Sequence, residues 1–186
     1  DVEDGVLTIV YKVVGKGTEQ MSAMKIGEKL DILTGLGNGY DLSVSGDRPL
    51  LLGGGVGVPP LYNLAKRLIA NGAHVTVVLG FNKADEVFYE EEFKALGIET
   101  IITTVDGSVG VKGFVTDALP ENYTYFYTCG PEPMLKAVYE GIIRARVAHA
   151  VGGLNEDEHR REVGREESTL VYLILHVGCE VLELLE

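Results

Sequence analysis

Cysteine and basic residues are scarce in this chain of 186 residues. Only Cys129 and Cys179 are present, far apart and without paired spacing, so one chain can build neither a disulfide framework nor a four-thiolate metal site. This use of cysteine fits a reducing, cytoplasmic location. Lysine and arginine number 16 against 28 aspartates and glutamates, a formal net charge of -12. Because nucleic acid is bound by a basic face that releases counterions, we expect no nucleic-acid partner.

Long apolar runs are also lacking. The longest run near the C-terminus, residues 170–175, is far shorter than the roughly 20 residues that a membrane-spanning helix needs, so we expect no membrane segment. The chain begins without methionine, basic region or cleavage site, and we expect it to begin inside a larger gene product. With 46% hydrophobic and 24% charged residues, the composition is that of a globular protein with one full domain and part of a second.

The first part of the chain has the pattern of β-structure. Residues 6–14 are rich in β-branched and aromatic side chains and stop at Gly15-Lys16-Gly17-Thr18, which predicts a strand followed by a glycine turn. A second short strand is predicted at residues 30–33, and the glycines of residues 35–39 predict a loop that a ligand could approach closely. We therefore interpret residues 1–47 as part of an antiparallel β-barrel.

After Arg48-Pro49 the pattern changes to alternating strands and helices, typical of right-handed βαβ units in a parallel sheet. Buried strands are predicted at residues 50–52, 75–79, 98–103 and 123–128. Helices are predicted over residues 61–69, 86–96 and from 133 to 142. The predicted fold class is thus an α/β parallel-sheet nucleotide-binding domain over residues 48–143, preceded by the partial barrel. Residues 144–186 are expected to form an atypical tail of helix or loop.

A glycine loop separates the first strand of this domain from its first helix. Gly55-Val56-Gly57-Val58-Pro59-Pro60 has the spacing G-x-G-x-x-P, in which proline replaces the third glycine of the dinucleotide-binding fingerprint and suits a helix start. Such a loop places backbone N–H groups at a helix N-terminus, where unpaired donors and the helix dipole favour phosphate. A tight turn without a ligand is the alternative, and the flanking strand and helix favour phosphate binding.

Four motifs occur in a characteristic order: residues 51–61 with the glycine loop, 77–81, 106–113, and 129–135 with Cys129-Gly130-Pro131. Together they resemble the ferredoxin-reductase superfamily, and within it the electron-transfer subunits of NAD-dependent (class 1B) bacterial dihydroorotate dehydrogenases. The resemblance includes residues 10–18 and 36–39 and extends over about residues 6–143.

The resemblance implies a nicotinamide dinucleotide whose pyrophosphate lies on the glycine loop and whose ring lies near Cys129, the catalytic candidate, where hydride passes to flavin. The nucleotide-binding residues implied are Gly54, Gly55, Gly57, Val58, Asp106, Gly130, Pro131 and Glu132. By their own chemistry, Cys129 could be only a small buried residue before a helix start, and Asp106 an ordinary turn residue.

The resemblance also implies FAD, held by the strand before Gly15 and by the glycine turn. The residues to which this carries over are Tyr11, Val13, Gly15, Gly17 and Thr18. A hairpin turn explains the Gly-Lys-Gly-Thr segment equally well. The Arg-x-Tyr-Ser/Thr motif with which the family holds its flavin is absent.

A [2Fe-2S] centre is expected for the family, but its four-cysteine motif is absent, because the tail supplies only Cys179. Two explanations remain open. The tail is either a divergent C-terminus or the result of a reading-frame change near Gly141. In the second case a four-cysteine pattern should occur in another frame of the gene downstream of Glu140.

The function implied is that of an electron-transfer flavoprotein component. Electrons from NADH would pass through FAD to a catalytic dihydroorotate dehydrogenase subunit of pyrimidine biosynthesis, in a heterotetramer. NAD is favoured over NADP because Asp85 and Glu86 would repel a 2′-phosphate and only Lys83 is basic nearby. The alternatives are a stand-alone NAD(P)H-flavin or ferredoxin reductase, a sulfide dehydrogenase subunit, or a nucleotide-binding module without turnover.

Overall fold

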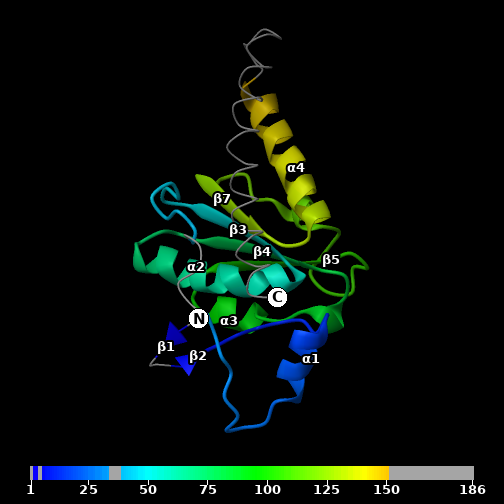
Figure 1. Ribbon diagram of the computed structural model, residues 1–186. Coiled ribbons are helices and arrows are strands. Elements are labelled where there is room, and N and C mark those ends of the chain that lie inside the picture. Colours follow the sequence, from blue (N-terminus) through cyan, green and yellow to red (C-terminus); the bar gives the residue numbers. More distant parts are fainter. Residues whose placement is uncertain (1, 4–5, 34–38, 151–186) are drawn as a thin grey trace.

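A parallel β-sheet forms the centre of the molecule (Figure 1). The computed structural model describes residues 2–3, 6–33 and 39–150. The sheet has five strands in the order β6-β5-β4-β3-β7. Their bounds are Pro49–Gly54 for β3, Thr76–Phe81 for β4, Glu99–Thr104 for β5, Val111–Lys112 for β6 and Tyr125–Cys129 for β7. Every neighbouring pair is parallel.

The strand β3, which lies between β4 and β7, is apolar on both faces because helices cover both. Leu51 belongs to the hydrophobic core on one face, while Leu50 and Leu52 belong to the core on the other. All three leucines are 0% exposed. A continuous apolar run of this kind is expected for a strand buried on both faces, and it explains why the run at residues 50–52 predicts β3 correctly.

Helices α2 and α3 lie on one face of the sheet and α4 on the other (Figure 1). Helix α2, Val58–Ala70, has prolines in its first turn and buries the side chains of Leu61, Leu64, Ala65 and Leu68. The short helix α3, Glu90–Ala95, adds Phe93 to the same core. On the opposite face, α4, Glu132–Ala150, contributes Val138 and Ile142, and the 3-10 helix η3, Val115–Ala118, contributes Val115.

The order of the strands creates a topological switch point beside β3. From β3 the chain proceeds outward through β4, β5 and β6, and then returns to β7 on the other side of β3. Gly53 of β3 is paired with Cys129 of β7, so the carboxyl ends of these two strands lie together. In open α/β sheets, ligands bind outside the carboxyl ends at such a point.

The four strands and the first and third helices predicted for the α/β domain are confirmed. The middle helix, predicted over residues 86–96, is shorter: the 3-10 helix η2 spans Ala84–Glu86, and Tyr89, with φ 66, precedes α3. The strand β6 was not predicted, because it is two residues long and lies inside a glycine-rich turn. Helix α4 continues to Ala150, and residues 151–186, which include Cys179, lie outside the described part.

The N-terminal residues depart from the predicted β-pattern. The antiparallel pair β1, Val2–Glu3, and β2, Val6–Leu7, is short, and residues 8–14 and 30–33 form no strand. The predicted glycine turn is instead the start of helix α1, Lys16–Ala23. A strand is stable only beside a partner strand, and residues 8–14 have none among the described residues. The helix start needs no distant partner, because the Thr18 hydroxyl bonds to Val14 N and Gly15 O within the same segment. The loop predicted at residues 35–39 lies outside the described residues except for Gly39, and the partial barrel stays a prediction.

Residues 40–48 are fastened to β7 and its preceding residue. The Tyr127 hydroxyl donates to the Asp41 carbonyl at 2.7 Å. The Thr124 hydroxyl donates to the Ser45 carbonyl at 2.6 Å, and its oxygen accepts the Arg48 N–H at 3.0 Å. These bonds join residues 76 to 86 positions apart in the sequence and bring residues 40–48 to the sheet edge next to Cys129.

We expect the Tyr127 hydrogen bond to make stability depend on pH in the alkaline range. Burial raises the pKa of Tyr127 from 10.0 to about 12, so the phenol ionises earlier in the unfolded chain. The stability that depends on the neutral phenol is therefore complete below pH 10 and is lost as pH rises to about 12. Urea unfolding should show Tyr127→Phe about 1 kcal/mol less stable at pH 7 and less sensitive to pH in this interval. Identical slopes would contradict the prediction.

Candidate functional site

The glycine loop begins where β3 ends and turns directly into α2. Gly54 is the last residue of β3, Gly55–Gly57 form the 3-10 turn η1, and α2 starts at Val58. Gly55 has φ 51, in the left-handed region that glycine favours, and a Cβ placed on it would meet nothing within 4 Å. The loop therefore has open space on its outer side, as a phosphate cradle requires.

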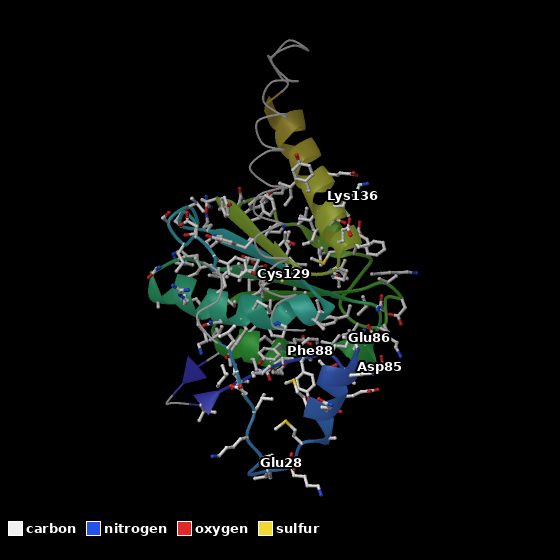
Figure 2. All side chains as sticks on the ribbon, viewed as in Figure 1. Glu28, Asp85, Glu86, Phe88, Cys129 and Lys136 are labelled. Carbon is white, nitrogen blue, oxygen red and sulfur yellow. The ribbon has the colours of Figure 1, made fainter. Side chains whose placement is uncertain are left out.

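Gly57 faces inward, against the Cys-Gly-Pro turn. A Cβ on Gly57 would collide with the Cys129 carbonyl and lie 2.6 Å from the Gly130 nitrogen. A Cβ on Gly54 would collide with the Met134 sulfur, and one on Gly130 would lie 3.2 Å from the Gly54 nitrogen. The two motifs that are far apart in the sequence are thus packed backbone against backbone, and Figure 2 shows Cys129 in the middle of the domain beside α2.

Two helices start at this edge of the sheet, and their first turns differ in charge. No acidic residue occupies the first turn of α2, whereas Glu132 begins α4. Since a helix N-terminus attracts anions and Glu132 already supplies one there, the start of α2 is the better place for a pyrophosphate. The glycine loop and Val58 therefore offer the pyrophosphate of a dinucleotide a helix start without negative charge.

Cys129 is buried at the end of β7. Its side chain is 3% exposed, and burial raises the pKa of the thiol, although a hydrogen bond with the Tyr40 side chain acts in the opposite direction. The thiol is therefore protonated at neutral pH, and the catalytic role predicted for Cys129 stays a prediction. The geometry favours a close-packed residue whose neighbouring backbone, Gly130 and Pro131, borders the site.

Asp106 stabilises its own turn by hydrogen bonds from Ser108, as its position before a glycine-rich turn predicts. Its Oδ1 accepts the Ser108 N–H at 2.9 Å and the Ser108 hydroxyl at 2.6 Å. These bonds, the hydroxyl first, hold the pKa of Asp106 below its ordinary value. A direct contact of Asp106 with a nucleotide ribose stays a prediction.

The residues predicted for flavin lie along the segment that leads into α1. The Thr18 hydroxyl accepts N–H groups from Val14 (3.0 Å) and Gly15 (3.2 Å) and donates to the Gly15 carbonyl, so it caps the helix. The first backbone hydrogen bond of the helix runs from Glu19 N to Gly15 O. The N–H groups that precede Glu19, including that of Gly17, therefore have no carbonyl partner within the helix. Tyr11 is half-buried and Val13 is exposed. In Figure 1 this segment lies on the side of the domain where α3 is.

The residues present do not fit a [2Fe-2S] centre of the family's kind. Within the described residues there is no group of three or more potential metal ligands, and the one described cysteine is buried in β7. The whole chain contains 2 cysteines against the four thiolates required. Nor is any helix of the described part long and apolar enough to cross a membrane.

A contact missed by the sequence analysis lies at the end of β4. Glu86 Oε2 accepts the side-chain amide of Asn82 at 2.8 Å and its backbone N–H at 3.3 Å. Asp85 pairs with Lys83 at 2.7 Å. Figure 2 shows Asp85 and Glu86 together at the border of the domain near α1. The sequence analysis named Asp85 and Glu86 for their charge, and only the structure shows the hydrogen bonds that Glu86 accepts.

Comparison with known proteins agrees with this geometry. The family model described as an oxidoreductase NAD-binding domain matches residues 51–140. The electron-transfer subunit of dihydroorotate dehydrogenase B (NAD(+)) from Fusobacterium nucleatum is 48% identical over 151 residues, 76% of this chain and 58% of the relative. The subunit of the same name from Bacillus pumilus is 54% identical over 136 residues, 70% of this chain and 52% of the relative. The chain belongs to this family.

The chain spans about half the length of the electron-transfer subunits that it matches. Among solved structures, an NADH-dependent reduced ferredoxin-NADP oxidoreductase is 37% identical, with a TM-score of 0.62 over 71% of this chain and 49% of that one. The cytochrome b5 reductase domain of Ulva prolifera nitrate reductase, 20% identical with a TM-score of 0.54 over 66% of this chain and 58% of that one, shares the fold. The predicted ferredoxin-reductase-like fold and family are therefore confirmed.

We expect Cys129 to resist alkylation in the native chain. Because the thiol is buried and its pKa is raised, iodoacetamide at pH 8 should modify it roughly a hundredfold more slowly than in the guanidinium-unfolded chain. Mass spectrometry of the peptide that contains Cys129 measures this ratio. Equal rates in the native and unfolded chains would show that the thiol is exposed.

Proposed function

We propose that this chain is the nucleotide-binding part of an electron-transfer subunit that takes electrons from NADH. The observation that carries the proposal is the close approach of Gly57 to the Cys129 carbonyl, which joins the glycine loop and the Cys-Gly-Pro turn at the switch point of the sheet. Family membership supports the same conclusion, because the matched relatives are named electron-transfer subunits.

In this proposal each part of the site has a role in holding NADH. The N–H groups of Gly55 and Gly57 bind the pyrophosphate at the start of α2, and Val58, whose own N–H donates to the Gly55 carbonyl, borders it. The turn of Gly130, Pro131 and Glu132 borders the nicotinamide, and the neutral thiol of Cys129 keeps this side of the ring free of charge. A bound flavin would supply the hydride acceptor, and the residues named above would position the nicotinamide for it.

The proposal includes FAD and a partner subunit. The residues proposed for the flavin are Tyr11, Val13, Gly15, Gly17 and Thr18, which lie before and at the start of α1; unlike that of α2, this first turn carries an acidic residue, Glu19. The catalytic subunit of dihydroorotate dehydrogenase is the proposed electron acceptor, in a heterotetramer of the cytoplasmic pyrimidine pathway. The relatives' names, as electron-transfer subunits, support this assembly.

A ferredoxin-type acceptor is a second candidate. Its support is the 37% identity to an NADH-dependent reduced ferredoxin-NADP oxidoreductase. Electron transfer to a reconstituted dihydroorotate dehydrogenase catalytic subunit, compared with transfer to ferredoxin, distinguishes the two acceptors.

The purified chain tests the proposal directly. We expect NADH to bind with a measurable heat in titration calorimetry, and added FAD to remain with the chain and to support NADH oxidation by a dye. Binding of NADH without FAD retention or dye reduction would leave a nucleotide-binding module without turnover. Absence of NADH binding by the wild-type chain would refute the proposed function.

We expect Gly57→Ala to weaken NADH binding at least about tenfold and to cost about 1–3 kcal/mol of stability, because the new methyl group pushes the glycine loop away from Cys129. Gly72→Ala is the matched control. Gly72 lies just beyond the far end of α2 with φ 85, so alanine there costs roughly 1–2 kcal/mol without touching the loop. Titration calorimetry and urea unfolding measure both quantities. Equal NADH affinity in Gly57→Ala and wild type would contradict the assignment of the loop.

A further inference from the structure

Apolar side chains are exposed along the whole of residues 6–14. The six aliphatic residues of this segment are each at least 39% exposed: Val6, Leu7, Ile9, Val10, Val13 and Val14. Lys12 is the only charged residue among the nine. Single exposed apolar residues are ordinary on a protein surface, whereas a contiguous series of them marks a surface that another polypeptide covers.

The exposure within the segment alternates as it does along a β-strand. Val6 and Val14 are 65% and 68% exposed, whereas their neighbours Leu7 and Val13 are 41% and 49% exposed. Tyr11, which shares a side with Leu7 and Val13 at a period of two residues, is half-buried. The odd-numbered side chains therefore face the domain, and the even-numbered ones face solvent.

The strand β2, with which the segment begins, has one edge that no described strand covers. β2 pairs with β1 in a sheet of two strands. Residues 8–14 belong to no strand, and Figure 1 shows them crossing from β2 to α1 in a single pass. The Val14 N–H donates to the Thr18 hydroxyl, so pairing along this edge would end before Val14. A strand edge with one charge and no proline is a template for a further strand.

The sequence of the segment is complementary to itself. Two copies can run antiparallel about a two-fold axis at Val10, which makes the contact the same on both chains. The opposed pairs are then Leu7 with Val13, Ile9 with Tyr11, Thr8 with Lys12, and Val10 with Val10 of the second copy. Apolar residues meet apolar residues, the two polar residues meet each other, and no like charges are opposed. A shift by one residue would place Lys12 opposite Leu7 or Ile9 and lose this match.

We infer that residues 7–13 are a self-association strand, through which two copies of this chain pair antiparallel about a two-fold axis at Val10. Pairing joins the two-stranded sheets of both copies into one larger sheet. A two-stranded sheet is marginal by itself, and additional strands with an apolar face stabilise it. Tyr11 and Val13, which are proposed for the flavin, remain on the domain side of this sheet. The inference does not rest on the proposed NADH site.

Charge substitutions at the two-fold axis test the pairing. Val10→Glu opposes two carboxylates, and Val10→Lys opposes two ammonium groups, at the roughly 5 Å that separates the Cβ atoms of opposed residues. A pair of short strands is small beside the ~1,600 Å² of a standard interface, so sedimentation equilibrium should show the wild type mainly monomeric at about 1 μM and mainly dimeric at about 200 μM. Each variant alone should dimerise about tenfold more weakly, and an equimolar mixture of the two should recover most of the lost affinity.

Val44→Glu is the matched control. Val44 is 45% exposed, against 44% for Val10, and it lies outside the paired residues. The substitution changes the net charge by the same amount as Val10→Glu. The dimer dissociation constant of Val44→Glu should therefore equal that of the wild type.

Hydrogen exchange identifies what covers the edge. In the proposed dimer, the amides of alternate residues within 7–13 become protected as the protein concentration rises, because those N–H groups bond to the second copy. Protection that is independent of concentration would show that a strand of the same chain covers the edge, and would overturn the inference.

Three results of the sedimentation experiments would also overturn it. The first is a wild type that stays monomeric at about 200 μM, the upper concentration expected for an interface of this size. The second is a dimer that Val10→Glu weakens no more than Val44→Glu does, because the contact then lies elsewhere. The third is a mixture of Val10→Glu and Val10→Lys that dimerises no better than either variant alone.

Discussion

The contact between the Gly57 Cα and the peptide that joins Cys129 to Gly130 is the constraint on which the site depends. Parallel pairing of β3 with β7 places Gly53 opposite Cys129, and the two chains leave the sheet side by side. They can remain together only because neither Gly54 nor Gly57 has a side chain that would strike Met134 or the Cys129 carbonyl. The starts of α2 and α4 are thereby held at one point, with the uncharged first turn of α2 available to an anion.

The starts of α2 and α4 are held in place by the buried strands from which they lead. The leucines of β3 are fully buried on both faces, and burial of each contributes about 1.5–3 kcal/mol. The loops above can therefore be built of glycine and still have a defined position. The N-terminal segment offers a contrast, since Val14 is 68% exposed and Leu33 is 74% exposed. There residues 8–14 find no partner strand among the described residues, and the capped helix α1 follows them.

Hydrogen bonds between loops fix the position of the segments that surround the sheet. The Asp106 turn is anchored on Thr104 and reaches the next loop through Ser108, while Tyr127 and Thr124 attach residues 41–48 to the opposite side of β3. Most of the polar atoms in these links are side-chain hydroxyls that bond to backbone groups. Such bonds are individually worth about 1 kcal/mol, and their effect is to fix loop positions more than to add stability.

Local sequence pattern by itself determined the parallel α/β domain and its family. The apolar run at residues 50–52, the 3.6-residue periodicity over residues 61–69 and the glycine loop are signals within a short stretch of chain, and each formed the predicted element. Tertiary structure alone decided the contacts between residues that are far apart in the sequence. It placed Gly57 against Cys129, buried the Cys129 thiol so that its pKa is raised, and linked Asp106 to Ala84 through Ser108. It also left residues 8–14 of the predicted strand without a partner strand and turned the glycine turn at residues 15–18 into a helix start, because strand formation requires a neighbour in space whereas a helix cap requires only its own four residues.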